Sequence, residues 1–331
     1  MDQLSLVLAQ AGPPTGLEKI LATLISGLGL GAIYALLALG FVIIFKATQV
    51  VNFAHGALAA LGAYLVVYFA VVLNFPGQYL TFLPIGVQWA ASAILGIVAA
   101  AFVGLLLELV FIRPMIGQPL FSVAIITLGI DAILRTVTND LIGTGIRPLK
   151  APFGDDLVAD VFRWGNVPIP HTQVATVLTA VLLLVGVALF FRSRTGIAMR
   201  ATAFDQETAM AQGISVGKVF GIAWMIGAAL AAVAGVFVSV PPRGSGATVA
   251  TAFVALRAFP VIVIGGLDSI VGAVVAGFGV GTIEVFAAVY LLPFSDVLGV
   301  GFSTIVPYLL MLVVLFIRPY GIFGTEEIRR V

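Results

Sequence analysis

The 26 residues ILATLISGLGLGAIYALLALGFVIIF, at positions 20–45, contain no charged side chain and decide the fold class. One crossing of a bilayer takes about 20 apolar residues. The run 47–107 then continues for 61 residues without a formal charge, apart from one neutral histidine. The first run is therefore long enough to cross once, and the second at least twice. The whole chain agrees, because 61% of its 331 residues are hydrophobic and 9% are charged, whereas soluble domains have about 25% charged residues.

These runs predict an all-α fold, a polytopic transmembrane helix bundle of about eight to nine membrane segments that includes one short or broken helix. Helices are expected because they satisfy their own backbone hydrogen bonds in lipid, and no alternating pattern of membrane β-strands is present. We treat residues 1–331 as a single transmembrane domain. The expected segments are 20–45, 50–73, 87–112, 120–142, 173–191, 219–240, 252–264, 268–291 and 297–317.

Two polar stretches interrupt the bundle. Residues 143–172 hold four prolines and balanced charges, which predicts an ordered extracytoplasmic loop. Residues 192–218 hold four bases and two acids, which predicts a cytoplasmic loop. With that loop inside, the positive-inside rule is satisfied by nine bases against five and places the N-terminus outside and the C-terminus in the cytoplasm. The inner bases are Lys46, Arg113, Arg192, Arg194, Arg200, Lys218, Arg318, Arg329 and Arg330, and the outer ones are Lys19, Arg147, Lys150, Arg163 and Arg243.

Several classes of function are disfavoured by the composition and motifs. The net charge of +1 argues against a nucleic-acid partner, and the chain has no cysteine and no cluster with metal-ligand spacing. Gly213-Ile-Ser-Val-Gly217 matches a hydrolase elbow, but that elbow requires a strand–turn–helix context with a histidine in reach. No phosphate-binding loop of ATPases is present. We therefore expect a transport protein that does not itself hydrolyse ATP.

One segment, 252–264, is too short to span the bilayer. It lies between Pro241-Pro242 and Gly265-Gly266 and contains Arg257 and Pro260. Such a segment in a transporter often marks a broken helix that lines the pathway. Packing alone can produce the same pattern, so a tilted or partly buried helix is the alternative.

Ionisable residues inside the spans are the candidate pathway residues. Asp131 and Arg135 are four residues apart and share a helix face, which predicts an ion pair. Glu284 lies within the segment 268–291, and Arg257 is its expected partner. Glu108 is expected to snorkel towards the cytoplasmic end. Contact of these groups with a zwitterionic solute is one interpretation, and a proton relay in an ion-coupled transporter is another.

Asn52 and His55 open the second span, in the sequence VNFAHG (51–56). Because Lys46 and Gln49 are placed in the cytoplasm, we expect both polar residues near the inner end of this span. Asn52 is expected to cap the helix, and the glycine that follows His55 is expected to allow close packing. A histidine in this place is more often a packing residue than a ligand, so a role in an inner gate is a hypothesis.

The cytoplasmic loop contains Glu207-Thr-Ala209 followed by Gly213, in the order E-x-A-x-x-x-G. This resembles the EAA loop of permeases in ABC importers, with Thr208 in place of the central alanine. The wider chain resembles the branched-chain amino acid permeases of these importers, the LivH type. The matching blocks are 27–45 (GLGLGAIYALLALGFVIIF), 51–56 (VNFAHG), 200–213, 256–259 (LRAF), 264–273 (IGGLDSIVGA) and 316–324 (FIRPYGIFG).

The resemblance implies a permease subunit in the bacterial inner membrane that moves branched-chain or other neutral amino acids. It implies a second permease, related or identical, and two cytoplasmic ATPase subunits that couple to this chain through Glu207, Ala209 and Gly213. It also implies an extracytoplasmic solute-binding protein. ATP and Mg²⁺ would be bound by the ATPase subunits, and no cofactor by this chain. Urea or short amides are alternative solutes, and an ion-coupled secondary transporter is the alternative class.

Overall fold

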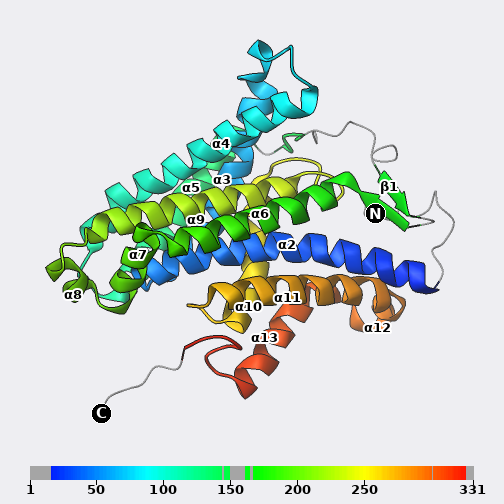
Figure 1. Ribbon diagram of the computed structural model, residues 1–331. Coiled ribbons are helices and arrows are strands. Elements are labelled where there is room, and N and C mark those ends of the chain that lie inside the picture. Colours follow the sequence, from blue (N-terminus) through cyan, green and yellow to red (C-terminus); the bar gives the residue numbers. More distant parts are fainter. Residues whose placement is uncertain (1–15, 144, 150–160, 165–166, 300, 326–331) are drawn as a thin grey trace.

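The computed structural model describes residues 16–143, 145–149, 161–164, 167–299 and 301–325 (Figure 1). The chain is almost entirely helical there, and its only strands among these residues form one antiparallel hairpin, β1–β2. The longer elements are α2 (Gly16–Thr48), α3 (His55–Val67), α4 (Ile85–Leu107), α5 (Leu120–Ile142), β1 (Val161–Trp164), β2 (Val167–Pro170), α6 (His171–Arg192), α7 (Arg194–Phe204), α8 (Gln206–Ala211), α9 (Val216–Ser239), α10 (Val254–Gly265), α11 (Ile270–Tyr290), α12 (Ser295–Leu298) and α13 (Val306–Ile317).

Seven of the described helices are long and apolar enough to cross a membrane, and an eighth span results if the helices on either side of residues 299–301 are joined. Together with the short helix α10, they confirm the predicted polytopic bundle. The expected segment 297–317 is the one that differs most, because α12 ends at Leu298 and helical structure resumes only at Phe302. Gly299 has a φ of +85°, which ends α12.

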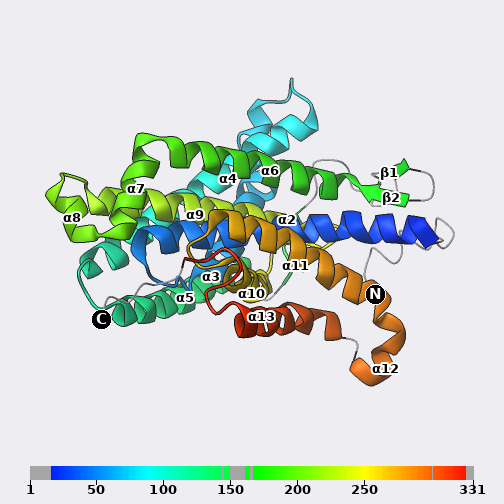
Figure 2. The same ribbon diagram turned by 60° about the horizontal axis from the view of Figure 1, so that its bottom comes forward.

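The centre of the bundle is formed by α2, α3 and α9, which are covered by α4, α5, α6, α10 and α11 (Figures 1 and 2). Small residues bring these helices together, because glycines at four-residue spacing on one helix face let backbones approach closely. A methyl group on Gly31 would lie 2.7 Å from the Cα of Phe278 in α11. One on Gly235 would lie 2.1 Å from the carbonyl oxygen of Ala59 in α3. The α2–α11 and α3–α9 contacts are therefore close backbone-to-backbone packing.

The connection between α2 and α3 turns back into the bundle. The turn is made at Gln49, which has a φ of +57°. Residues 49–54 are not helical, and the Oγ1 of Thr127 in α5 accepts a hydrogen bond from the N–H of Phe53 and lies 3.3 Å from the carbonyl oxygen of Val51. Irregular backbone of this kind is tolerated at membrane depth only where protein or a cavity surrounds it.

His55 consequently lies deeper than the sequence predicts. Its Nε2 is 3.0 Å from the carbonyl oxygen of Leu37, and Leu37 precedes the end of α2 by 11 residues, or about 16 Å at 1.5 Å per residue. Asn52 and His55 therefore stand at the first end of the second span, as the sequence predicts, but this end lies inside the bundle and not at its surface. Helix α3 begins inside the bundle, level with Leu37, which is about two-thirds of the way along α2.

The predicted short segment is a 3₁₀ turn, η5 (Val249–Phe253), followed by α10. Pro260 lies inside α10 and cannot donate to the carbonyl oxygen of Leu256, four residues earlier. The hydroxyl of Tyr308, in α13, donates a hydrogen bond of 2.9 Å to that same oxygen. The irregularity in α10 is thus satisfied by a neighbouring helix, as broken membrane helices require.

The two ends of the bundle differ in character (Figure 2). Helices α7 and α8 lie at one end, beside the end of α2, and the β1–β2 hairpin lies at the other end, beside the start of α2. The described part of the loop predicted at 143–172 is at the hairpin end, where Arg147 and Ala247 exchange backbone hydrogen bonds. Residues 150–160 of that loop, and the chain termini at 1–15 and 326–331, lie outside the described residues.

Candidate functional site

The loop predicted to couple to an ATPase folds as two short helices, α7 and α8, joined at Asp205. The carboxylate of Asp205 begins α8 as its N-cap. It accepts hydrogen bonds from the backbone N–H of Thr208, at 3.0 Å, and from the hydroxyl of Thr208, at 2.6 Å. These hydrogen bonds lower the pKa of Asp205, because they favour the charged carboxylate. The exposed turn between the two helices is therefore well defined at neutral pH.

Gly213 ends α8. Its φ is +80°, its N–H donates to the carbonyl oxygen of Met210, and the next N–H, of Ile214, donates to that of Ala209. This pair of bonds is a Schellman motif, for which glycine is the favoured residue. Ala209 is buried and Glu207 is exposed. The three predicted coupling residues therefore have separate places: one packs inwards, one faces outwards and one ends the helix.

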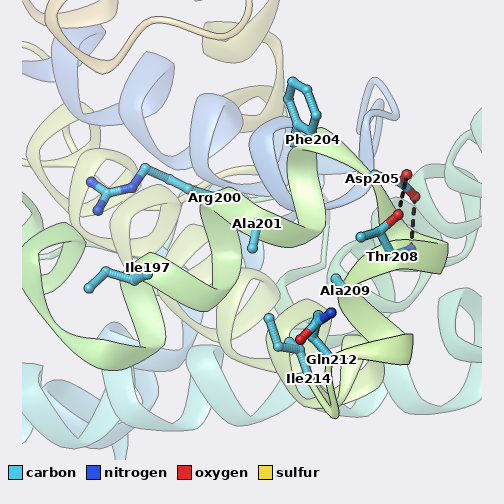
Figure 3. Close-up of a pocket in the computed structure, with 9 residues that line it drawn as sticks. All are labelled: Ile197, Arg200, Ala201, Phe204, Asp205, Thr208, Ala209, Gln212 and Ile214. Atoms are coloured by element: carbon cyan, nitrogen blue, oxygen red, sulfur yellow. Dashed lines mark hydrogen bonds between the residues drawn. The ribbon is translucent and has the colours of Figure 1, made fainter.

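A cavity of about 450 Å³ separates α7 from α8 (Figure 3). Its walls are largely apolar, with polar side chains from Arg200, Asp205, Thr208 and Gln212. Beside it, the side chain of Phe204 is 94% exposed. An exposed aromatic side chain next to an apolar cavity is typical of a protein-binding surface. The lining residues are Ile197, Arg200, Ala201, Phe204, Asp205, Thr208, Ala209, Gln212 and Ile214.

Arg113 links the end of the third span to the start of α9 through hydrogen bonds. Helix α9 follows directly after the coupling helices α7 and α8. The Arg113 guanidinium donates two hydrogen bonds to the carboxylate of Glu108, at 3.1 and 2.9 Å, and one to the carbonyl oxygen of Gly217, at 3.0 Å. The Glu108 side chain is completely buried. The prediction that Glu108 snorkels is therefore wrong, because a bidentate arginine partner within reach makes its burial tolerable.

Asn52 and His55 are both buried and line a small cavity between α3 and α10. The amide oxygen of Asn52 accepts a hydrogen bond from the N–H of Ala54, two residues on. This is a local turn, and the N-cap of α3 is Ala54, so the prediction that Asn52 caps the helix is wrong. The expected close packing at Gly56 is confirmed, since a methyl group there would lie 2.3 Å from the carbonyl oxygen of Ala252.

The ion pair predicted on the fourth span is present. The Nε of Arg135 lies 2.7 Å from Oδ2 of Asp131, and the two side chains are only 25% and 18% exposed. The guanidinium also lies over the ring of Phe253, 4.7 Å from its centroid, in a cation–π contact. Because Phe253 belongs to η5, the pair lies beside the broken segment.

Glu284 is held by a different partner from the one predicted. The hydroxyl of Tyr34 in α2 donates a 2.7 Å hydrogen bond to its carboxylate. Among the described residues, Arg257 forms no ion pair with it, and the Arg257 side chain is exposed on α10. Arg257 is close enough for a favourable Coulomb interaction with Glu284 but forms no direct ion pair with it. The direct partner is Tyr34, a polar side chain in an otherwise apolar run that lies opposite Glu284 across the α2–α11 contact.

Arg243, which the sequence suggested only as an outer charge, is half-buried against α2. Its guanidinium donates a 2.6 Å hydrogen bond to the carbonyl oxygen of Ser26 in α2. Burial lowers the pKa of Arg243 to about 10, which leaves it charged at neutral pH. In the sequence, the feature that marks this arginine is the proline pair directly before it, in the loop after α9.

The matching family model, described as a branched-chain amino acid transport system permease component, covers residues 23–315. This chain belongs to that family. The permease is 31% identical over 317 residues to the high-affinity branched-chain amino acid transport system permease protein BraD of Pseudomonas aeruginosa, covering 94% of this chain and 98% of BraD. It is 28% identical to LivH of Escherichia coli K12, covering 94% and 97%, and 28% identical to the probable LivH of Methanocaldococcus jannaschii, covering 88% of each chain.

The described part of the permease also bears on the alternative transporter class. A proton relay would need its carboxylates on one path, but these three lie on three different spans and each has its own partner. Glu108 pairs with Arg113 and Asp131 with Arg135 on their own spans, and Glu284 accepts from Tyr34 of α2. The hydrolase-like motif runs from the turn after α8 into the first two residues of α9, so it is not in a strand–turn–helix context. No group of side chains that could hold a metal ion is found among the described residues.

Proposed function

We propose that this permease is the membrane subunit of an ATP-binding cassette importer that moves branched-chain or other neutral amino acids by alternating access. The observation that carries the proposal is the family match over residues 23–315. It is supported by relatives named as high-affinity branched-chain amino acid transport permeases at full length. The proposed partners are a second permease, related or identical, two ATPase subunits that bind ATP and Mg²⁺, and an extracytoplasmic solute-binding protein.

The α7–α8 surface is the proposed docking site of an ATPase subunit. The exposed ring of Phe204 and the apolar cavity between the helices offer contact area, and Glu207 offers a charge at its edge. Movement of α8 would pass into the bundle through α9, whose first turn is bonded to Arg113. This short connection suits a transporter in which ATP hydrolysis outside the membrane changes how the helices pack within it.

The orientation that follows places the α7–α8 end in the cytoplasm of a bacterial cell and the β1–β2 end outside. Lys46, Arg113 and Arg318 lie at the ends of helices on the α7–α8 side, together with the bases of α7. The positive-inside rule favours this choice. It corresponds to an extracytoplasmic N-terminus and a cytoplasmic C-terminus.

Transport in reconstituted vesicles tests the proposal. The permease, its partner permease and ATPases are placed in vesicles with the binding protein outside, and uptake of labelled L-leucine is followed. Uptake should require both ATP and the binding protein. Uptake driven by a proton gradient without ATP would overturn the importer assignment.

The coupling surface has its own test. Glu207→Lys and Gly213→Pro should lower ATPase binding or ATPase stimulation while the permease still inserts. Asp140→Lys is the matched control, because Asp140 is an exposed acid near the end of α5 that lies away from α8. Normal coupling in both loop variants would show that α8 is not the coupling element.

A further inference from the structure

The small cavity between α3 and α10 has unusual chemistry for its depth. It measures about 50 Å³ and lies against Leu37 and Phe41 of α2, in the middle of the bundle. Phe259 in α10 closes one side, with its ring 6.4 Å from that of Phe41. No formally charged side chain lines the cavity, yet two buried polar side chains, Asn52 and His55, do.

The first polar feature is a set of hydrogen-bond donors. Helix α3 begins at His55, and no side chain caps its N-terminus. Uncapped N–H groups and the helix dipole favour a negative charge at this end. The amide oxygen of Asn52 is used by Ala54, while its Nδ2 is buried and has no hydrogen-bond partner. An amide N–H₂ left unpaired in the interior is unfavourable, so a ligand that accepts from it would be stabilised.

The second feature is an acceptor. The Nε2 of His55 faces the carbonyl oxygen of Leu37 at 3.0 Å, and a carbonyl can only accept. In a neutral imidazole the proton is therefore on Nε2, and Nδ1 is an acceptor. That Nδ1 is buried and has no partner. A ligand that donates a hydrogen bond, such as an ammonium group, would satisfy it.

We propose that this cavity is the closed form of a site for the head group of a zwitterionic amino acid. The carboxylate would bind at the N-terminus of α3 and the amide of Asn52, and the ammonium group would donate to Nδ1 of His55. A site without formal charges suits a solute whose own charges sum to zero. The inference rests on the proposed function, since it names the place where the imported solute contacts the membrane subunit.

The site must open to be used. At about 50 Å³ it holds roughly one or two water molecules, which is less than an amino acid occupies. Helix α10 is the wall that can move, because it is short, contains Pro260 and ends at Gly266, which has a φ of +100°. Withdrawal of α10 from α3 would enlarge the cavity without unfolding either helix.

Two conservative variants separate binding from structure. Asn52→Asp keeps the oxygen that accepts from Ala54 and replaces the donor by a second acceptor, which repels a carboxylate. His55→Gln keeps a donor for the carbonyl oxygen of Leu37 and removes the Nδ1 acceptor. Asn139→Asp, at an exposed site near the end of α5, is the matched control. In the full reconstituted complex, each cavity variant should transport L-leucine about 10- to 100-fold more slowly per ATP hydrolysed, the range expected for lost hydrogen bonds to charged groups.

A direct binding measurement completes the test. The chain has two histidines, so the ¹⁵N resonances of His55 can be assigned by comparison with the His55→Gln variant. L-leucine should shift the Nδ1 resonance in the intact complex, and 4-methylpentanoate, which lacks the ammonium group, should not. If wild-type vesicles do not take up branched-chain amino acids, the proposed function fails. If they do, while both cavity variants transport normally or leucine leaves Nδ1 unshifted, the site assignment fails and the importer assignment stands.

Discussion

Substituting Arg113 by alanine is the sharpest test of the packing at the α9 junction. The change removes three hydrogen bonds and leaves the Glu108 carboxylate, which is 0% exposed, without its counter-charge. Breaking a buried ion pair from one side lowers the free energy of unfolding by about 3–5 kcal/mol. We expect the lower half of that range, because the Arg113 side chain is 39% exposed and water can partly replace it.

The double variant Glu108→Leu/Arg113→Met isolates the charge effect. Because both charges are removed together and the volume is largely kept, its stability should lie within about 1–2 kcal/mol of wild type. Unfolding of the wild-type permease, Glu108→Leu, Arg113→Met and the double variant in detergent, followed by circular dichroism across a denaturant series, gives the four free energies of the double-mutant cycle. Additive single-variant effects, or a loss below about 1 kcal/mol for Arg113→Ala, would refute the view that this pair is an energetically coupled clamp.

Three further outcomes follow from described contacts. Gly56→Ala should lower the free energy of unfolding by about 1–3 kcal/mol, because its methyl group would lie 2.3 Å from a backbone oxygen of η5. Gly129→Ala is the control and should be neutral or slightly stabilising, because the space around Gly129 is open. Equal melting curves for the two variants would contradict this. Tyr34→Phe removes the hydroxyl that donates to Glu284 and should reduce the free energy of unfolding by about 1–3 kcal/mol, and unchanged denaturant unfolding would show that the bond is dispensable. The pKa of Asp205 is lowered in the folded chain. Its carboxylate should therefore cap α8 unchanged from pH 7 to 5 and lose this role only as the pH falls through the lowered pKa. A spin label on α8 should accordingly become more mobile only in strong acid.

The sequence could predict the structural features that depend on residues close together along the chain. Apolar run length predicts the spans, and the pair Asp131–Arg135 is confirmed because residues four apart on one helix must meet. Gly213 ends α8 for an equally local reason, since a left-handed residue after a short helix favours glycine. These features need no knowledge of how the helices are arranged.

Contacts between distant segments could not be derived in the same way. The partner of Glu284 is 250 residues away in sequence, and several polar residues in the spans could equally have met it. The depth of His55 was missed because hydropathy does not distinguish a helix that begins at the surface from one that begins inside the bundle. The irregular stretch 49–54 is as apolar as a helix, and only its hydrogen bonds to Thr127 show where it lies.

The interlocked glycines of α2 and α11 have a consequence for biosynthesis. Helix α2 is the first described span to leave the ribosome, yet the face that carries Gly27 and Gly31 is covered by Thr282 and Phe278, which are made some 250 residues later. Until then, the small-residue face of the central helix has only lipid or the insertion machinery against it. Chains that stop before α11 should therefore be substrates for membrane quality control, even though every earlier span is complete.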